Sequence, residues 1–79
     1  SPYLLIINAD TKEVEDEITD TVKKLAGAYK LKSKNITKDG MDLILEVKAG
    51  KEKELVDRLS GMKGITAVSL LAHDGEVKG

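Results

Sequence analysis

Residues 3–9 read Tyr3-Leu-Leu-Ile-Ile-Asn-Ala9, and this short run decides the fold. It is long enough for a β-strand and too short for a helix. Apolar side chains on both of its faces are typical of a strand in the middle of a sheet. The rest of the chain can be divided into elements by working outward from it.

A helix is predicted from Thr11 to Ala26, directly after this strand. We expect Asp10 to cap its first turn, with Glu13 at the capping-box position three residues on. Acidic residues in the first turns and lysines in the last favour the helix dipole, and Gly27 is expected to end the helix. The apolar residues recur at the spacing of one helical stripe, at Val14, Ile18, Val22 and Leu25.

The remaining chain predicts a hairpin, a second helix and a final strand. The expected ranges are Tyr29–Thr37, Met41–Lys48, Lys51–Ser60 and Ile65–Ala72, followed by a turn at Asp74-Gly75. In the second hairpin strand, side-chain alternation puts a set of apolar residues on one face: Met41, Leu43, Leu45 and Val47. The second helix turns Leu55, Val56 and Leu59 inward, with Met62 just beyond it.

The hairpin register follows from the loop length. A three-residue loop, Lys38-Asp39-Gly40, places Leu31 opposite Val47, so apolar meets apolar. The same loop places Lys32 opposite Glu46, so opposite charges meet. A two-residue loop of Asp39 and Gly40 would set Lys32 opposite Val47, so we prefer the longer loop with the glycine at positive φ.

The element order is strand, helix, strand, strand, helix, strand. With right-handed crossovers it predicts an α+β fold, a ferredoxin-like βαββαβ sandwich with a four-stranded antiparallel sheet and two helices on one face. The first and third strands would be central and the other two would be edges. The length allows one domain, residues 1–79, with an ordered core of about 3–73.

Composition excludes several classes of function. The chain has no Cys, and therefore no disulfide, thiolate metal site or thiol nucleophile. Its net charge of −1 excludes a nucleic-acid binder that is driven by bulk charge. The longest apolar run, residues 3–7, is far shorter than the about 20 residues of a membrane helix, so we expect no direct membrane insertion by this segment.

No catalytic constellation can be placed on this fold. The third strand lacks the aromatic residues with which RNA-recognition motifs stack bases. Arg58, the sole arginine, is expected to be a surface residue rather than a phosphate ligand. His73 has no second imidazole with which to complete a metal site, and the acidic residues near the chain start lack the EF-hand pattern. We therefore expect no enzyme activity, no metal and no cofactor.

The two edge strands differ in charge. Lys30, Lys32 and Lys34 would lie along one face of the second strand, where lysines discourage edge-to-edge pairing. A phosphate-binding strip is the weaker alternative. The final strand has no charge across its eight residues, which leaves its edge open to a partner.

The sheet face away from the helices is expected to be apolar. Ile44 would point outward, beside either Leu4 and Ile6 or Leu5 and Ile7, and the last strand would add an aliphatic row. The predicted interface residues are Ile44, Ile65, Val68, Leu70 and Leu71. The expected partner is another copy of the chain or a neighbouring domain of the same protein.

A second hypothesis is a sensor of an amino acid or another small metabolite. Asn8, Asp10 and Thr11 would contact this effector at a helix N-terminus, where anions are favoured. The helices are rich in Lys and Glu, which also fits a de novo designed domain, but the uneven turns and the polar Ser33 and Asn35 on the inward side of their strand argue against idealised design.

The chain resembles the ACT-like regulatory domains. The similarity rests on the hydrophobic first strand, on Asp10, and on the stretch Leu59-Ser-Gly-Met-Lys-Gly-Ile-Thr-Ala-Val-Ser-Leu-Leu71. The closing Ser69-Leu-Leu-Ala-His-Asp-Gly75 is similar to the C-terminal cytoplasmic module of uncharacterised bacterial membrane proteins of the MgtC type. In amino-acid-binding members Asp and then Pro-Gly follow the first strand, and here only the aspartate matches.

This resemblance covers about residues 3–76 and implies a regulatory or assembly module. The chain begins at Ser1 without an initiator Met, so we expect an excised piece of a longer protein. The expected location is the cytoplasm, with a tether to the inner membrane through a part of the parent that is missing here. The leading hypothesis is thus a non-catalytic regulatory or dimerisation module.

Overall fold

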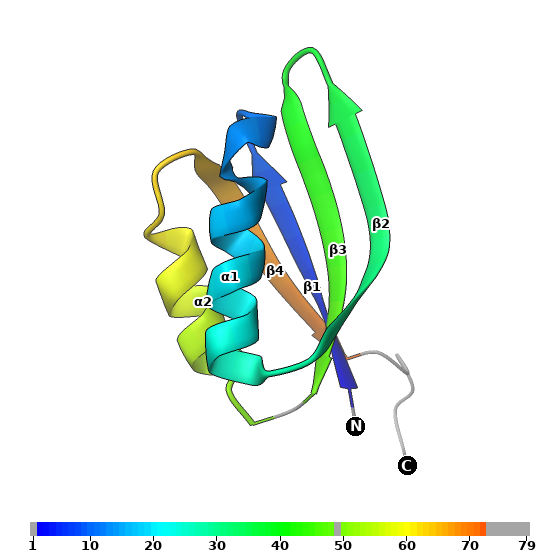
Figure 1. Cartoon of the computed structure of the whole chain (residues 1–79), viewed down its shortest axis with the longest axis vertical. Helices are drawn as coiled ribbons and strands as arrows, with labels where there is room; N and C mark the ends of the chain where they lie inside the picture. Colours follow the sequence, from blue (N-terminus) through cyan, green and yellow to red (C-terminus); the bar gives the residue numbers. More distant parts are fainter. Residues whose placement is uncertain (1, 49, 73–79) are drawn as a thin grey trace.

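Two layers build the molecule: a β-sheet and a pair of helices that cover one of its faces (Figure 1). The computed structural model describes residues 2–48 and 50–72, so the predicted Asp74-Gly75 turn and His73 lie outside the described residues. The elements are β1 (Pro2–Ala9), η1 (Lys12–Val14), α1 (Glu15–Ala26), β2 (Tyr29–Thr37), β3 (Gly40–Lys48), α2 (Glu52–Ser60) and β4 (Ile65–Ala72).

The sheet has the topology that the sequence predicts. In the described residues its strands are antiparallel and lie in the order β2-β3-β1-β4. β1 and β3 are central, while β2 and β4 form the edges. The α+β ferredoxin-like βαββαβ fold is therefore confirmed.

The core lies between the helices and the sheet, and it is apolar throughout. Among the described residues no buried side chain is polar or charged. The predicted inward faces are confirmed, because alternate residues of the central strands and the helical stripes meet here. The fully buried side chains are Leu5, Ile7, Ile18, Val22, Leu43, Leu45, Leu55 and Leu59, with Met41 and Val47 almost as deep.

The first helix does not begin as predicted. The Asp10 side chain is exposed and caps nothing, while the Asp10 backbone N–H donates to the Gly64 carbonyl oxygen over 2.8 Å. Thr11 is the N-cap instead, because its backbone is extended and its Oγ1 accepts from the Glu13 N–H at 3.1 Å. A 3-10 turn follows and passes into α1. The end of α1 is as predicted, at Gly27 with φ of +81°.

The β2–β3 loop is tighter than predicted. Gly40 already pairs with Thr37, so the loop has two residues, Lys38 and Asp39. Gly40 has a φ of +147°, and a Cβ at this position would overlap the backbone of Ala9. Glycine is therefore required here both by conformation and by the close approach of β1. The predicted three-residue loop was therefore wrong, and so was the alternative two-residue loop of Asp39 and Gly40.

The hairpin register also differs from the prediction. Leu31 lies opposite Leu45 and not Val47. Lys32 is the extra residue of a β-bulge, which alternation in the sequence does not reveal. The expected meeting of Lys32 with Glu46 nevertheless occurs as an ion pair, with Nζ and Oε1 3.7 Å apart.

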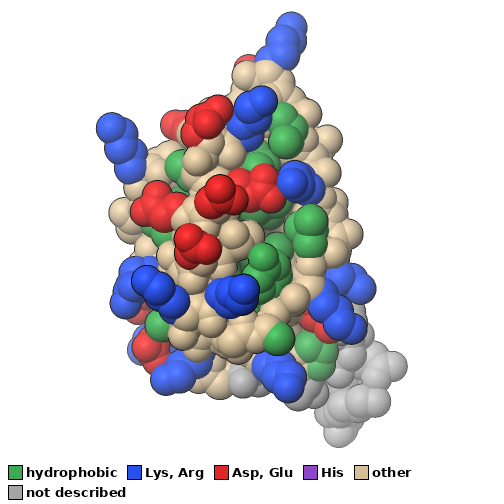
Figure 2. Space-filling view, in the orientation of Figure 1, with side chains coloured by type: hydrophobic (Ala, Val, Ile, Leu, Met, Phe, Trp, Pro, Cys, Tyr) green, Lys and Arg blue, Asp and Glu red, His purple; other side chains and the backbone are tan. Residues whose placement is uncertain are grey.

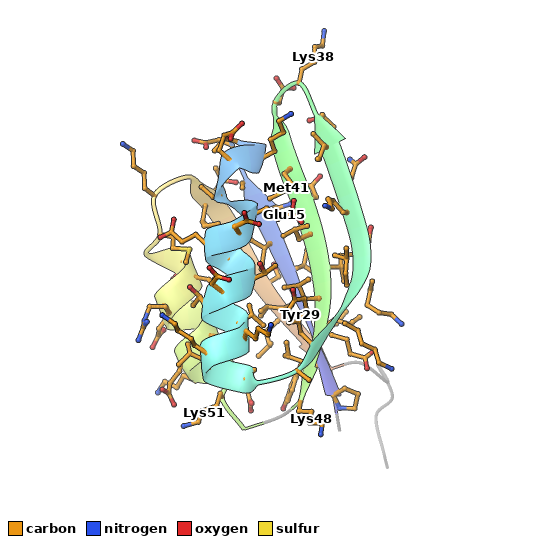
Figure 3. The ribbon with its side chains drawn as sticks, viewed as in Figure 1. Glu15, Tyr29, Lys38, Met41, Lys48 and Lys51 are labelled. Atoms are coloured by element: carbon orange, nitrogen blue, oxygen red, sulfur yellow. The ribbon has the colours of Figure 1, made fainter. Side chains whose placement is uncertain are left out.

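Because of the bulge, the following residues of β2 change faces. Ser33 and Asn35 lie on the uncovered face, so their predicted inward orientation was wrong. Lys34 and Ile36 turn to the helix side, opposite buried residues of β3. Glu15 projects from α1 toward the hairpin (Figure 3), and its Oε2 lies 2.8 Å from the Lys34 Nζ.

The second helix begins one residue later than predicted, at Glu52. The Gly50 N–H donates to the Glu52 carboxylate, and this hydrogen bond, together with one from the Glu52 N–H, holds the pKa of the carboxyl below its ordinary value. A lowered pKa in the folded state adds stability above the ordinary carboxyl pKa, and this contribution is lost as the pH falls. The contribution is small because Glu52 is exposed to solvent screening.

Candidate functional site

A cluster of aliphatic side chains lies at the centre of the uncovered sheet face. The outward pair of β1 is Leu4 and Ile6, because the residues that alternate with them are fully buried. Ile6 lies opposite Ile44 of β3, and Leu4 lies opposite Leu71 of β4. We call Leu4, Ile6, Ile44 and Leu71 the open-face cluster. Three of them are half-buried by their neighbours, whereas Leu71 is 52% exposed.

Polar side chains border the open-face cluster. Toward the hairpin end, the Asn8 amide donates to the Asp42 carboxylate over 2.5 Å. At the two edges, Ser33 of β2 lies opposite Ile44 and Ser69 of β4 lies opposite Ile6. β4 thus adds a single large aliphatic side chain to this face. The expected aliphatic row was wrong, because the other large residues of β4 have the opposite orientation.

The predicted interface residues of β4 are divided between the two sides of the sheet. Ile65 and Val68 face the helices and pack against the core. Leu70 has the same orientation and is 36% exposed near the end of the strand, whereas Leu71 lies on the open face. Each side of this edge therefore presents an exposed leucine. The whole strand, Ile65–Ala72, carries no charge.

The other edge strand of the sheet, β2, carries lysines that hinder pairing with another strand. The predicted row of three on one face was wrong, because the bulge at Lys32 sends Lys34 to the helix side while Lys30 stays opposite Glu46 on the open face. Lysines on both faces, combined with a bulge, hinder strand pairing at this edge more than a single row would.

The exposure of two hydrophobic residues on β2 was not predicted from the sequence. Leu31 and Ile36 are 48% and 49% exposed although they face the helix side. The reason is that β2 lies beyond the helix layer (Figure 1), and apolar side chains are visible in this region in the space-filling view (Figure 2). Alternation identifies such residues as apolar but does not show that no helix covers them.

The structure does not bring the three predicted ligand residues together. Asn8 lies on the open face, with its amide bonded to Asp42. Asp10 and Thr11 do line one hollow, of about 250 Å³, between the start of the first helix and the hairpin. The Thr11 Oγ1 already accepts a hydrogen bond there from the Glu13 N–H.

A wider hollow of about 720 Å³ is an open groove between α1 and α2. Glu17, Glu54 and Asp57 line it together with Arg58 and Lys63, so most of the negative charge in the groove is offset by positive charge. Across residues 2–48 and 50–72, no three His, Asp or Glu side chains are grouped so that they could hold a metal ion. In the same residues, none of the helices has the length and hydrophobicity that crossing a membrane requires.

Comparison with protein-family models, curated proteins and solved structures found no match to the chain. The observed fold is shared by proteins of many functions and does not by itself identify one. Function must therefore be argued from the surfaces described above.

Proposed function

We propose that this domain is a non-catalytic regulatory or dimerisation module. The observation that carries the proposal is the exposed apolar surface around β4, where the open-face cluster adjoins an uncharged edge strand that has an exposed leucine on each side. Apolar patches of this kind mark interaction sites more often than isolated exposed leucines do.

The energetic argument rests on the size of the domain. A domain of 79 residues has an expected free energy of unfolding of about 4–12 kcal/mol. Each aliphatic side chain that is fully buried stabilises by roughly 1.5–3 kcal/mol. Completing the burial of a few half-covered residues would therefore add a substantial share of the total stability, and a partner can supply that burial.

The cellular setting is the second part of the proposal. The sequence resemblance to ACT-like domains supports a cytoplasmic module that is tethered to the inner membrane of a bacterium by another part of its parent protein. The βαββαβ fold agrees with this resemblance. In that setting the partner is a second copy or an adjoining domain of the parent.

Sedimentation velocity of the unaltered chain tests the proposal. From about 1 to about 500 μM protein, the average mass should rise from that of the 8.6-kDa monomer toward twice that value, since weak association follows mass action. Association should persist at about 1 M salt, because apolar contacts are not screened as ion pairs are. A monomer at every concentration would contradict the proposal.

Ligand sensing is the alternative function, and the hollow lined by Asp10 and Thr11 is the feature that favours it. A bound effector would raise the melting temperature through mass action. We expect amino acids and nucleotides at millimolar concentration to shift it by less than about 1 °C. The Thr11 Oγ1 already accepts a hydrogen bond, and the charges that line the hollow cancel, with Asp10 and Glu13 against Lys12 and Lys38. A larger, saturable shift would favour the alternative instead.

A further inference from the structure

We infer that β4 pairs in antiparallel orientation with β4 of a second copy, about a two-fold axis that passes through Ser69. The two sheets would join into one sheet of eight strands with all four helices on the same side. This inference rests on the proposed self-association and specifies the surface and the register through which it occurs.

The first argument is the position of the two exposed leucines. Leu70 lies on the helix side of β4 and Leu71 on the open side, at neighbouring positions of the same edge. A partner that covered the open face would reach Leu71 and leave Leu70 in water. A strand added in the plane of the sheet places side chains beside both, since its own residues alternate between the two faces.

The charges of the two edge strands determine which strand of a second copy pairs with β4. β4 is neutral along its length, so a second β4 meets no like charge. β2 of another copy is a poorer partner, because its lysines hinder pairing and its bulge at Lys32 interrupts the middle of the strand, whereas the bulge of β4, at Thr66, lies near the start of that strand. A β4–β2 contact would also leave a free β2 edge on one copy and a free β4 edge on the other, so further molecules could add without limit. β4–β4 pairing uses the same edge of both copies and ends at a dimer.

Side-chain size fixes the register. With Ser69 opposite its symmetry mate, Leu71 lies opposite Ala67 on the open face, and Leu70 lies opposite Val68 on the helix side. Residues that face each other across the axis share one side of the sheet, as antiparallel pairing requires. Each exposed leucine then contacts a smaller apolar residue. The regular pairing runs from residue 67 to 71 and stops before Thr66, which is the extra residue of a β-bulge against β1.

The flank of α2 enlarges this contact. Glu54, Asp57 and Arg58 line the groove on the side of α2 that faces α1. Val56 is half-buried against the core on the opposite flank, above the β4 side of the sheet. The two-fold axis would bring the α2 helices of both copies close to each other along this flank.

The area of the contact predicts a weak dimer. The facing edges, residues 66–72, span about 24 Å, and a helix layer on a sheet is about 20 Å thick, so each copy contributes roughly 500 Å². The total of roughly 1,000 Å² lies at the lower limit of specific interfaces. The dimer should therefore dissociate reversibly on dilution.

Two matched serine variants test the inference. Ser69→Lys places two lysines opposite each other at the proposed axis, and Ser33→Lys makes the same change on the same sheet face at the opposite edge. Both serines are exposed, so both variants should fold. In sedimentation, Ser69→Lys should weaken dimerisation by about tenfold or more and Ser33→Lys by less than about twofold.

A cysteine variant tests the register itself. The chain has no cysteine, so Ser69→Cys introduces a single thiol. Residues opposite each other in antiparallel strands have Cα atoms about 4.5–5.5 Å apart, within the range of a disulfide. Mild oxidation should link two copies through Ser69→Cys and should leave Ser33→Cys monomeric under the same conditions.

The outcomes separate the two proposals. If the unaltered chain dimerises while Ser69→Lys has no effect and Ser69→Cys does not cross-link, the edge-pairing inference is wrong and the dimerisation module stands. If the unaltered chain is a monomer at every concentration, both are wrong.

Discussion

Replacing Gly40 with alanine should destabilise the domain by about 3 kcal/mol or more, the largest effect that we expect from a single added methyl group. The residue combines a φ of +147° with backbone contact: a Cβ would overlap the carbonyl of Ala9. Neither problem can be relieved by a rotamer change, because the neighbouring atoms belong to the central strand β1. Urea unfolding followed by circular dichroism would measure the change.

Two other glycines serve as matched controls. Gly27 has a φ of +81° with open space where a Cβ would lie, so Gly27→Ala carries strain alone and should cost about 1 kcal/mol. Gly61 has a φ of −87° and ordinary contact distances of 3.7 Å, so Gly61→Ala should be close to neutral. If Gly40→Ala is no more destabilising than Gly27→Ala, the described approach of β3 to β1 is wrong.

Leu5→Ala should destabilise by about 2–5 kcal/mol, as other large-to-small changes in cores do. Leu5 is fully buried at the centre of β1, between Leu45 and Leu70 in the neighbouring strands. Its removal leaves a cavity that is enclosed by both helices and the sheet. Since the whole domain is expected to have about 4–12 kcal/mol of stability, this loss is a large share of the total, and the urea midpoint should fall accordingly.

The adjacent residue provides the control for this prediction. Leu4 loses the same atoms in Leu4→Ala, but its side chain lies on the open face and is only half-buried. At a concentration at which the chain is monomeric, this variant should lose roughly 1 kcal/mol. Equal losses for Leu4→Ala and Leu5→Ala in urea unfolding would contradict the assignment of the two faces of β1.

Much of the fold could be predicted because it depends on patterns that repeat along the chain. The stripe through Ile18 and Val22 and the alternation through Leu43 and Leu45 each place several residues on one face, so a local error does not change the result. The order of six such elements then restricts the topology to few choices.

The errors arose where one residue or one hydrogen bond decides the outcome. The sequence of β2 fits a regular strand as well as a strand with an extra residue at Lys32. The extra residue moves every later side chain of β2 to the opposite face of the sheet. Asp10 has the side chain of a good N-cap, but its backbone is bonded to Gly64, which is distant in sequence, and Thr11 takes the capping position. Neither the bulge nor the Asp10–Gly64 hydrogen bond can be recognised in the local sequence.

The candidate site was predictable in part for the same reason. The absence of charge in β4 is a property of the sequence, and the structure places that strand at an edge. The division of Leu70 and Leu71 between the two faces follows from alternation once the neighbouring strand is known. The exposure of Leu31 and Ile36 could not be predicted, because it depends on where the helix layer ends.

The most direct measurement of the central claim is backbone amide hydrogen exchange as a function of protein concentration. In a monomer, the amides of β4 that point away from β1 have no strand partner and should exchange quickly. If a second copy covers this edge, their protection should rise as the concentration is increased from the monomeric to the dimeric range, while the outward amides of β2 stay unchanged. The claim that a second copy covers the β4 edge would be contradicted if the sample dimerises by mass but the protection of β4 is the same at both concentrations.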